Sequence, residues 1–385
     1  MFGVISSGMV AVMSQNIGAG RPGIAYQARQ LGLAFNAVLG VIMSLFLSLG
    51  AGTILSGVGV ADALMQPAKT YLQIVGGFCI LNALIPICSS YLRAFGFSKE
   101  PLYASIIGNV INFCLNAFFL FVLHKGVAGV ATATVISRII NLVIVVLLGA
   151  VLVKAKQHPE RESNRAVMGQ IIRIGLPSAC ETAIYNVSMT LVIRFLNQMD
   201  AQGLNVTARS YTMQITNFSY CVGAALAQAN AIMTGWHIGA KEYDACDRGT
   251  KKAAVIGVIV AVILETVFTL CSGWIMQLFS KDPQMVSLVG KLLAIDIVLE
   301  IGRVTNLVYG QALKTSGDAV FPVVMGACFM ILCSVGGTYL FGIRLGLLAV
   351  GAYIGMAGDE CVRAVGMYLR WKSGKWKEKG LVKSR

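Results

Sequence analysis

Long apolar runs separated by short polar segments dominate the chain. A helix that crosses a bilayer needs roughly 20 mostly apolar residues, and ten runs approach or exceed that length. We expect helices at residues 30–56, 68–92, 101–123, 128–153, 174–197, 205–234, 250–279, 285–313, 320–341 and 346–370. A shorter apolar run, from Phe2 to Met13, precedes them. The pattern predicts an all-α polytopic membrane protein.

Composition supports this fold class and excludes others. Hydrophobic residues make up 56% of the 385 residues, and charged residues make up 12%, against about 25% in a soluble domain. A soluble enzyme, a nucleic-acid binder and a disordered scaffold are therefore excluded. The three histidines share no metal-ligand spacing, and the ten cysteines form no CxxC pair. We expect neither a metal site nor a cofactor, and no enzymatic activity.

The net charge of +14 is unevenly distributed among the loops. One alternate set of loops, with the C-terminal tail, carries 21 Lys and Arg, including Lys154 and Lys156. The opposite set carries four: Lys69, Lys125, Lys281 and Arg344. Because cytoplasmic loops are enriched in Lys and Arg, the first set and the C-terminus are predicted to be cytoplasmic. We expect a multi-pass protein of the plasma (cytoplasmic, or inner) membrane.

Three short segments recur at nearly one offset. Ile17-Gly18-Ala19 recurs as Ile238-Gly239-Ala240, and Pro101 has its counterpart in Pro322. Gly126-Val127-Ala128-Gly129-Val130 recurs as Gly346-Leu347-Leu348-Ala349-Val350. Both copies lie on the same predicted side of the membrane, so the halves are parallel repeats. Such repeats usually form two lobes around a central cavity, which is typical of transporters.

The repeat divides the chain into segments. We expect an N-terminal lobe at 1–153, a cytoplasmic linker at 154–173, a C-terminal lobe at 174–371 and a basic cytoplasmic tail at 372–385. The second half has six predicted spans, whereas the first has four and the short run at its start. We therefore expect the N-terminal lobe to be incomplete, lacking its first helix.

The chain resembles the multidrug and toxic compound extrusion (MATE) family of secondary transporters. In the first half the resemblance rests on Gln15-Asn16-Ile17-Gly18-Ala19-Gly20, Leu92-Arg93-Ala94-Phe95-Gly96, Gly108-Asn109-Val110-Ile111-Asn112 and the run from Gly126 to Thr134. In the second half it rests on Gly175-Leu176-Pro177 and Lys314-Thr315-Ser316-Gly317-Asp318. The resemblance implies two six-helix lobes, cytoplasmic termini, and efflux of cationic or amphipathic compounds in exchange for Na⁺ or H⁺. The missing piece is then the first helix of the family and much of the second.

Charged residues at membrane depth are the candidates for ion coupling, because burying a charge in a bilayer is costly. Asp296, Glu300 and Arg303 have the spacing i, i+4 and i+7, so they share one helix face. Asn306 and Tyr309 extend this polar face. Glu300 and Arg303 can pair. The pair is either a structural lock or a switch that opens when Glu300 is protonated.

Glu181 is a further ion-coupling candidate. It lies four residues after Pro177, about one turn into the predicted helix. A proline weakens the helical ladder and can leave carbonyl groups free to join a carboxylate around a cation. The alternative is a structural acid near the cytoplasmic entrance, bonded to a neighbouring helix.

Amides supply the candidate cavity lining. Asn109, Asn112 and Asn116 share one helix face, where they either line the cavity or bond to a neighbouring helix. The family often has an aspartate at the third position, and an amide cannot be titrated. The ion site is therefore expected in the second lobe. Gln214 and Asn217 are further lining candidates.

The function that the sequence favours is a secondary active antiporter that exports xenobiotic small molecules by alternating access of two lobes. We expect a monomer whose partners are the substrate and membrane lipid, with no nucleic acid. No GxxxxGK[ST] phosphate loop occurs, which disfavours ATP as the driving force.

Two alternatives remain open. A flippase for a lipid-linked substrate would need a strongly cationic cavity. A flippase would be favoured over a drug exporter if four or more membrane-depth bases faced one cavity, out of Arg138, Arg194, Arg209, Lys291, Arg303 and Arg363. The other alternative is a truncated remnant that does not transport.

Overall fold

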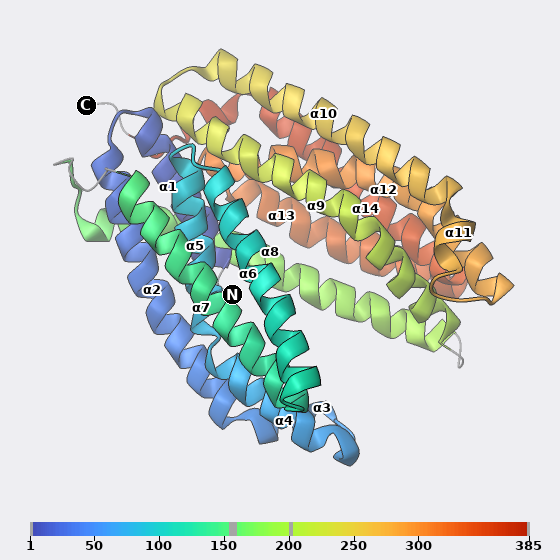
Figure 1. Ribbon diagram of the computed structural model, residues 1–385. Coiled ribbons are helices and arrows are strands. Elements are labelled where there is room, and N and C mark those ends of the chain that lie inside the picture. The colour runs from blue at the N-terminus through green and yellow to red at the C-terminus, as the bar shows by residue number, and fades with distance from the viewer. Residues whose placement is uncertain (1–2, 154–159, 200–202, 383–385) are drawn as a thin grey trace. The chain divides into compact units, whose positions relative to one another are not determined.

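The computed structural model describes residues 3–153, 160–199 and 203–382, and within these ranges every regular element is a helix (Figure 1). The predicted all-α class is confirmed. The chain divides into two compact units, Met1–Gly175 and Leu176–Arg385. We refer to them as the first unit and the second unit.

The first unit is built around two long helices, α2 and α7. Its helices are α1 (Gly3–Gly18), α2 (Pro22–Leu49), α3 (Ala51–Val58), α4 (Asp62–Gly77), α5 (Ile80–Ala94), α6 (Lys99–Ala117), the π-helical turn η1 (Phe118–Val122) and α7 (Gly126–Leu152). Helix α2 packs against α1, α4 and α5, and α7 packs against α4, α5 and α6. Pro22 stands in the first turn of α2, where the missing N–H costs no helical hydrogen bond.

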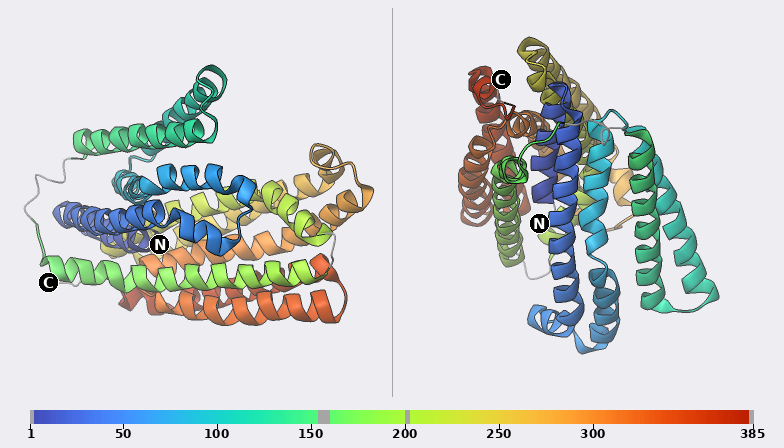
Figure 2. Two further views of the ribbon diagram at one scale, coloured as in Figure 1. Left: turned by 90° about the horizontal axis from the view of Figure 1, so that it is seen from below. Right: turned by 90° about the vertical axis from the view of Figure 1, so that its left-hand side faces the viewer.

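The second unit is organised around α12. Its elements are α8 (Asn164–Met199, shared with the first unit), α9 (Leu204–Gly239), α10 (Tyr243–Leu270), α11 (Ser272–Met276), α12 (Pro283–Thr315), α13 (Val320–Phe329), the π-helical turns η3 (Met330–Val335) and η4 (Thr338–Arg344), α14 (Leu348–Lys372) and the 3₁₀ turn η5 (Lys375–Glu378). Helix α12 packs against α9, α10 and α14. Figure 2 shows the long helices of this unit running alongside one another.

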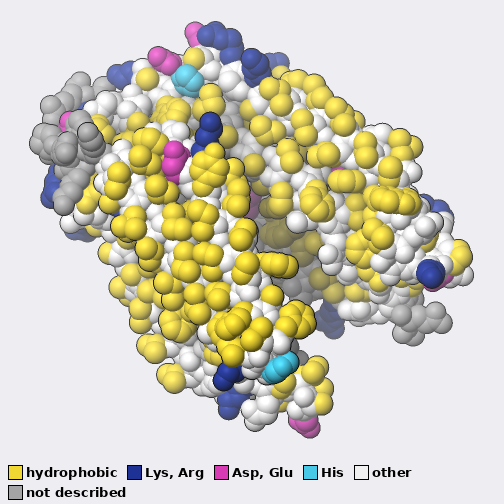
Figure 3. Space-filling view, viewed as in Figure 1, with side chains coloured by type: hydrophobic (Ala, Val, Ile, Leu, Met, Phe, Trp, Pro, Cys, Tyr) yellow, Lys and Arg dark blue, Asp and Glu magenta, His cyan; other side chains and the backbone are white. Residues whose placement is uncertain are grey.

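The long helices fall into an apolar group, which could cross a membrane, and a more polar group. Five segments of the described chain are long and apolar enough to cross a membrane: Pro22–Leu49, Lys99–Val122, Gly126–Leu152, Tyr243–Leu270 and Val320–Arg344. The bent pair of α4 and α5 makes a sixth. Hydrophobic side chains cover most of the helix surface in Figure 3, while Lys and Arg gather mainly near helix ends. Among the described residues, α8, α9, α12 and α14 are also long but do not meet the same criterion, because they carry more polar groups.

The backbone reproduces the internal repeat. Corresponding elements lie 221 residues apart: α1 and α9 end at Gly18 and Gly239, α2 and α10 begin at Pro22 and Tyr243, and α6 and α13 begin at Lys99 and Val320. Gly96 and Gly317 occupy matching turns with φ of 88° and 98°, a conformation that only glycine adopts without strain. The repeat predicted from three short motifs therefore extends through the helices of both halves.

Several boundaries differ from the sequence-based expectation. The helices expected at 30–56 and 250–279 are each divided, into α2 and α3 and into α10 and α11. The helix expected at 68–92 is two helices, α4 and α5, bent by 41°, because α4 ends at the pair Gly76-Gly77. Helix α8 begins at Asn164, so residues 164–173 of the expected linker are helical, and Pro177 lies inside α8 instead of opening it. Lys154 and Lys156 of that linker lie outside the described residues.

The segment after α14 packs back onto the second unit. We call its described part, residues 374–382, the C-terminal strap. The Trp376 ring stacks on the Trp371 ring with centroids 4.1 Å apart, and its Nε1 donates to the Trp371 carbonyl at 2.9 Å. Asp318, in the turn after α12, accepts from Arg370 Nε and Lys379 Nζ, each at 2.7 Å. The expected basic tail thus has a buried aromatic anchor.

Candidate functional site

A cavity of about 490 Å³ lies within the second unit. Four helices and the η3 turn line it with Glu181, Thr182, Tyr185, Asn186, Met189, Arg209, Met213, Thr216, Asn217, Tyr220, Asp296, Leu299, Arg303, Asn306, Leu307, Lys314, Met330, Tyr353, Met356, Glu360 and Arg363. Its volume is within the usual range of small-molecule sites.

Helical periodicity explains which residues reach the cavity. On α9 the lining residues are Arg209, Met213, Thr216, Asn217 and Tyr220, which are spaced three and four apart and so share one face. The other cavity helices, α8, α12 and α14, show the same spacing. These four are the long helices that do not meet the membrane-span criterion in the described chain. Their polar residues therefore face the cavity instead of lipid.

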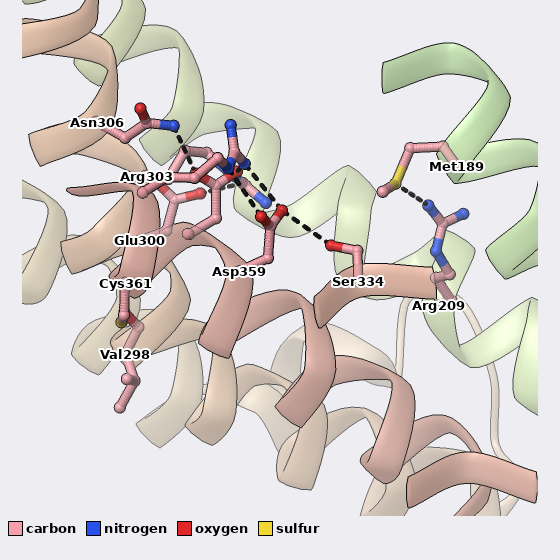
Figure 4. A network of polar contacts seen from close by, with 11 residues as sticks. Met189, Arg209, Val298, Glu300, Arg303, Asn306, Ser334, Asp359 and Cys361 are labelled. Carbon is pink, nitrogen blue, oxygen red and sulfur yellow. Dashed lines mark hydrogen bonds and ion pairs between the residues drawn. The ribbon is translucent and has the colours of Figure 1, made fainter. Parts of the chain in front are cut away.

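Two arginines and three carboxylates join α12 to α14. Glu300 and Arg303 form an ion pair within α12 (Figure 4). Arg303 Nε also lies 3.7 Å from Glu360 Oε1 on α14. Arg363 Nη2 approaches the same Glu360 oxygen at 2.8 Å, and Arg363 makes two hydrogen bonds with Asp359, at 2.8 and 3.0 Å.

Neutral donors complete this network. Asn306 Nδ2 donates to Glu360 Oε2 at 3.0 Å, and Ser334 Oγ of η3 donates to Asp359 Oδ2 at 2.9 Å. Asp359 and Arg363 are buried at 2% and 3% exposure. Buried charges need pairing and hydrogen bonds to offset desolvation, and both are present here. Glu360 is the residue that contacts both arginines.

Two further acids lie beside the network without a full set of partners. Asp296 is buried, and within the described chain its Oδ2 has no hydrogen-bond partner. Glu265 of α10 is fully buried, and neither of its oxygens has a partner of normal geometry in the described chain. Ser219, Asp296 and Glu300 are among its polar neighbours. An ionised carboxylate in this setting is costly, so these positions suit groups that take up a proton or a cation.

Glu181 is held by a partner that the sequence did not suggest. Lys314 Nζ lies 2.5 Å from Glu181 Oε2, and both residues line the cavity. Gly326 of α13 faces the same carboxylate, since a Cβ added there would lie 3.4 Å from Glu181 Cγ. Lys314 is in the last turn of α12. The pair therefore links the terminal turn of α12 to α8, one turn after Pro177.

Arg209 differs from the other two arginines of the cavity. Its hydrogen bond is to Met189 Sδ, at 3.7 Å, and its Nε is buried without a partner in the described chain. Figure 4 shows its side chain pointing towards Met189. A thioether is a weak acceptor, so this guanidinium is uncompensated.

The predicted site residues fall into two groups. Glu181, Asp296, Arg303, Asn217 and Asn306 line the cavity. Glu300 is fully buried and does not line the cavity. It forms an ion pair with Arg303, which does. Gln214 and Tyr309 do not line it. The Tyr309 ring packs against Tyr368 and Trp371, because position 309 points away from the Asp296–Arg303 face.

The three asparagines of the first unit bond in part to one another and to α7. Asn116 Nδ2 donates to Asn112 Oδ1 at 3.1 Å, and Asn112 Nδ2 donates to Ser137 Oγ at 3.3 Å. Asn109 is exposed. Asn112 thus bonds to a neighbouring helix, which was one of the two expected roles. That these asparagines line a cavity stays a prediction.

Two further sequence-based hypotheses can be compared with the site. The described residues contain no group of three or more His, Cys, Asp or Glu that could hold a metal ion. Of the six membrane-depth bases, Arg209, Arg303 and Arg363 line the cavity, which is one fewer than the number that would favour a flippase over a drug exporter. The acids Glu181, Asp296 and Glu360 line the same cavity, so its walls are mixed in charge.

Comparison with known proteins places this fold. The MatE family model matches residues 1–118 and 177–340. The uncharacterized transporter YisQ of Bacillus subtilis is 32% identical over 388 aligned positions, covering 99% of this chain and 85% of its own. The probable multidrug resistance protein NorM of Thermotoga maritima is 22% identical, covering 98% of this chain and 82% of its own.

Solved structures agree. A crystal structure of MATE in the straight conformation superposes with a TM-score of 0.88 at 19% identity, covering 98% of this chain and 85% of its own. An outward-facing multidrug resistance MATE transporter of the MOP superfamily gives 0.87 at 18% identity, covering 100% and 85%. Since the family model covers most of the sequence and the fold agrees throughout, the chain belongs to the MATE family of multi-pass membrane transporters.

Proposed function

We propose that this protein is a secondary active antiporter. It exports cationic or amphipathic small molecules across the plasma membrane in exchange for H⁺ or Na⁺, as a monomer with its C-terminus in the cytoplasm. The observation that carries the proposal is the buried network of Glu300, Arg303 and Glu360 beside a cavity of ligand size.

Proton binding at Glu300 provides a coupling step. Glu300 and Glu360 both face Arg303, which is their shared counter-charge. Adding a proton to Glu300 removes one of the two ion pairs of Arg303, which leaves the pair with Glu360 and the nearby Asp296. Because Glu300 lies on α12 and Glu360 on α14, this change favours a different packing of the two helices. A ligand shifts a conformational equilibrium only through such a difference between states.

The arrangement of the acids favours H⁺ over Na⁺. Glu300, Asp359 and Glu360 each contact a guanidinium group, instead of converging with other oxygen ligands around one point. A sodium ion would have to displace these arginines to gain several oxygen ligands, whereas a proton needs only one carboxylate oxygen.

The cavity walls suit amphipathic substrates. Met189, Met213, Met330 and Met356 line them, and methionine adapts to ligands of different shape. Tyr185, Tyr220 and Tyr353 add aromatic faces, on which flat or cationic groups can stack. These contacts support broad selectivity instead of recognition of a single compound.

Efflux of a fluorescent organic compound from vesicles tests the coupling. Wild type and Glu300→Gln are compared under separate Na⁺ and H⁺ gradients, with Glu378→Gln on the exposed strap as the matched control. We expect the H⁺ gradient to drive wild type and the control alike. Glu300→Gln is expected to lower the driven rate on the order of tenfold, because the amide cannot release a proton.

Two results would contradict the proposal. A full response of Glu300→Gln to the H⁺ gradient would remove Glu300 from the coupling step. A wild type that responds to neither gradient would not be an antiporter for these ions.

A further inference from the structure

Arg209 is the cavity arginine that contacts no carboxylate within the described chain. Arg303 and Arg363 each approach two acidic residues. Arg209 approaches Met189 Sδ at 3.7 Å, and its Nε has no partner. Arg209 is 7% exposed and lines the cavity. A charged group is thus removed from water with no counter-charge beside it.

The other cations of the cavity already have acidic partners. Lys314 pairs with Glu181, and the α12–α14 network pairs its arginines with its own acids. Asp296 is the remaining acid, and its charged neighbours are Arg303 and Glu360. Tyr353 is near both Asp296 and Arg209, but Arg209 forms no ion pair with Asp296 in the described chain. Arg209 is then the cavity cation that has no acid within ion-pair distance in the described chain, and an anionic group of a ligand would supply that missing partner.

Thioether and aromatic side chains are among the neighbours of Arg209. Met189 Sδ of α8 accepts its hydrogen bond, Met213 stands one turn further along α9 and also lines the cavity, and Tyr353 of α14 is near it. In such a setting a guanidinium binds a carboxylate strongly and in a defined orientation, through two parallel N–H···O bonds. The methionines then offer a surface for the apolar part of the same molecule.

We propose that Arg209 is an anion subsite of the cavity, and that the substrates include amphipathic acids and zwitterions in which a carboxylate or similar anionic group binds Arg209. This inference rests on the proposed function in one respect, namely that the cavity holds the transported molecule. A purely cationic substrate would leave the guanidinium uncompensated.

Two fluorescent probes isolate the anionic group. Nε-dansyl-lysine and dansylcadaverine share the dansyl ring, the alkyl chain and a primary ammonium, and differ by the carboxylate. Binding of each is measured at equilibrium with the purified full chain, from the rise in dansyl fluorescence. We expect wild type to bind dansyl-lysine about tenfold to a hundredfold more tightly than dansylcadaverine, the usual range for a buried charge-assisted bond.

The preference is expected to depend on the charge at position 209. Arg209→Met should abolish it, while Arg209→Lys should retain part of it, because lysine keeps the charge but not the two parallel donors. Arg248→Met, on the exposed start of α10, is the matched control and should bind both probes as wild type does. A thermal unfolding curve for each variant separates loss of the anion site from loss of folding.

Three outcomes would overturn the inference. One is equal binding of the two probes by wild type. Another is a preference that survives in a folded Arg209→Met protein. The third is a chloride-dependent thermal stabilisation that requires Arg209 in a protein without preference for dansyl-lysine, which would make the subsite one for an inorganic anion.

The binding experiment uses no ion gradient, so it is independent of coupling. If the vesicles show no driven efflux but the Arg209-dependent preference is present, the antiport proposal fails and the anion subsite stands. If efflux is driven but the preference is absent, the reverse holds.

Discussion

Arg363 shows how a charge can be accommodated in the second unit. It is buried, and its guanidinium contacts both Asp359 and Glu360. Removing one member of such a group leaves the others buried without compensation, which costs more than the group contributes as a whole. The contribution of Arg363 is therefore best measured by removing it alone and then together with a partner.

Arg363→Met is expected to lower the free energy of unfolding by about 3–5 kcal/mol, the usual cost of breaking a buried ion pair. The change is measured as the shift of the thermal unfolding midpoint in detergent. The exposed Arg248→Met is the control and should shift it little. The double variant Arg363→Met with Asp359→Asn should recover part of the loss, and a double variant no more stable than the single one would argue against the pairing.

At this scale the sequence predicted local pairing and missed distant partners. Glu300 and Arg303 are three residues apart on one helix, so their spacing alone indicated the ion pair. Glu360 lies 54 residues from Asn306, its hydrogen-bond donor, and no periodicity connects them. Lys314 follows the end of the helix expected at 285–313, so the sequence places it outside that helix. Its place in the last turn of α12 was the signal that could have suggested a partner on a neighbouring helix.

Among the elements, the C-terminal strap depends on one buried acid. The Asp318 side chain is 1% exposed and is bonded to Arg370 at the end of α14 and to Lys379 of the strap. Burial alone would raise the pKa of Asp318, but the hydrogen bonds and charges of Arg370 and Lys379 outweigh it and lower the pKa. A carboxyl whose pKa is lower in the folded state than in the unfolded state stabilises the fold above the unfolded pKa.

Asp318→Asn should therefore reduce stability near neutral pH. The difference from wild type is expected to be fully present above the unfolded pKa of about 3.9 and to shrink as pH falls through the lower folded value. Unfolding midpoints measured from pH 7 down to pH 3 test this. Glu378→Gln, also on the strap, should show no comparable difference. A gap between Asp318→Asn and wild type that stayed constant with pH would mean that the ion pairs are not its cause.

Elements were predicted well where apolar runs are unbroken and less well where polar residues enter helices. All ten expected spans have helical counterparts, because backbone groups in a bilayer must bond within helices. Helix α8 extends ten residues before its expected start at 174, because its first turns are polar and were assigned to the linker. The bend between α4 and α5 follows a glycine pair that membrane helices often tolerate, so sequence alone did not predict it.

At the scale of the whole molecule, the repeat places corresponding residues of the two halves in different surroundings. Gly96 and Gly317 have nearly the same backbone conformation. A Cβ added at Gly96 meets nothing within 4 Å, whereas one at Gly317 would overlap the carbonyl of Lys379 in the strap. The same substitution thus tests the backbone alone in one half, and the backbone and the strap in the other.

Gly96→Ala should lower the free energy of unfolding by about 1–2 kcal/mol, the cost of a left-handed conformation for a residue with a Cβ. Gly317→Ala should cost more and should also change the fluorescence of the stacked Trp371 and Trp376, because the strap must move. Thermal unfolding and tryptophan emission of the purified variants provide the two measurements. Equal costs with unchanged emission would show that the strap does not press on this turn.

The shared register of the two halves also allows their residues at corresponding positions to be compared. A gene duplication begins with identical copies, so each pair of corresponding positions records a later divergence. The positions that match Glu265, Asp296, Glu300 and Arg303 hold Ser44, Val75, Cys79 and Asn82. Ser44 Oγ accepts the N–H of Ile80 just after the bend between α4 and α5, whereas the corresponding part of the other half is the single helix α12, which carries the buried Glu300. Corresponding segments thus hold a bend in one half and buried charged residues in the other.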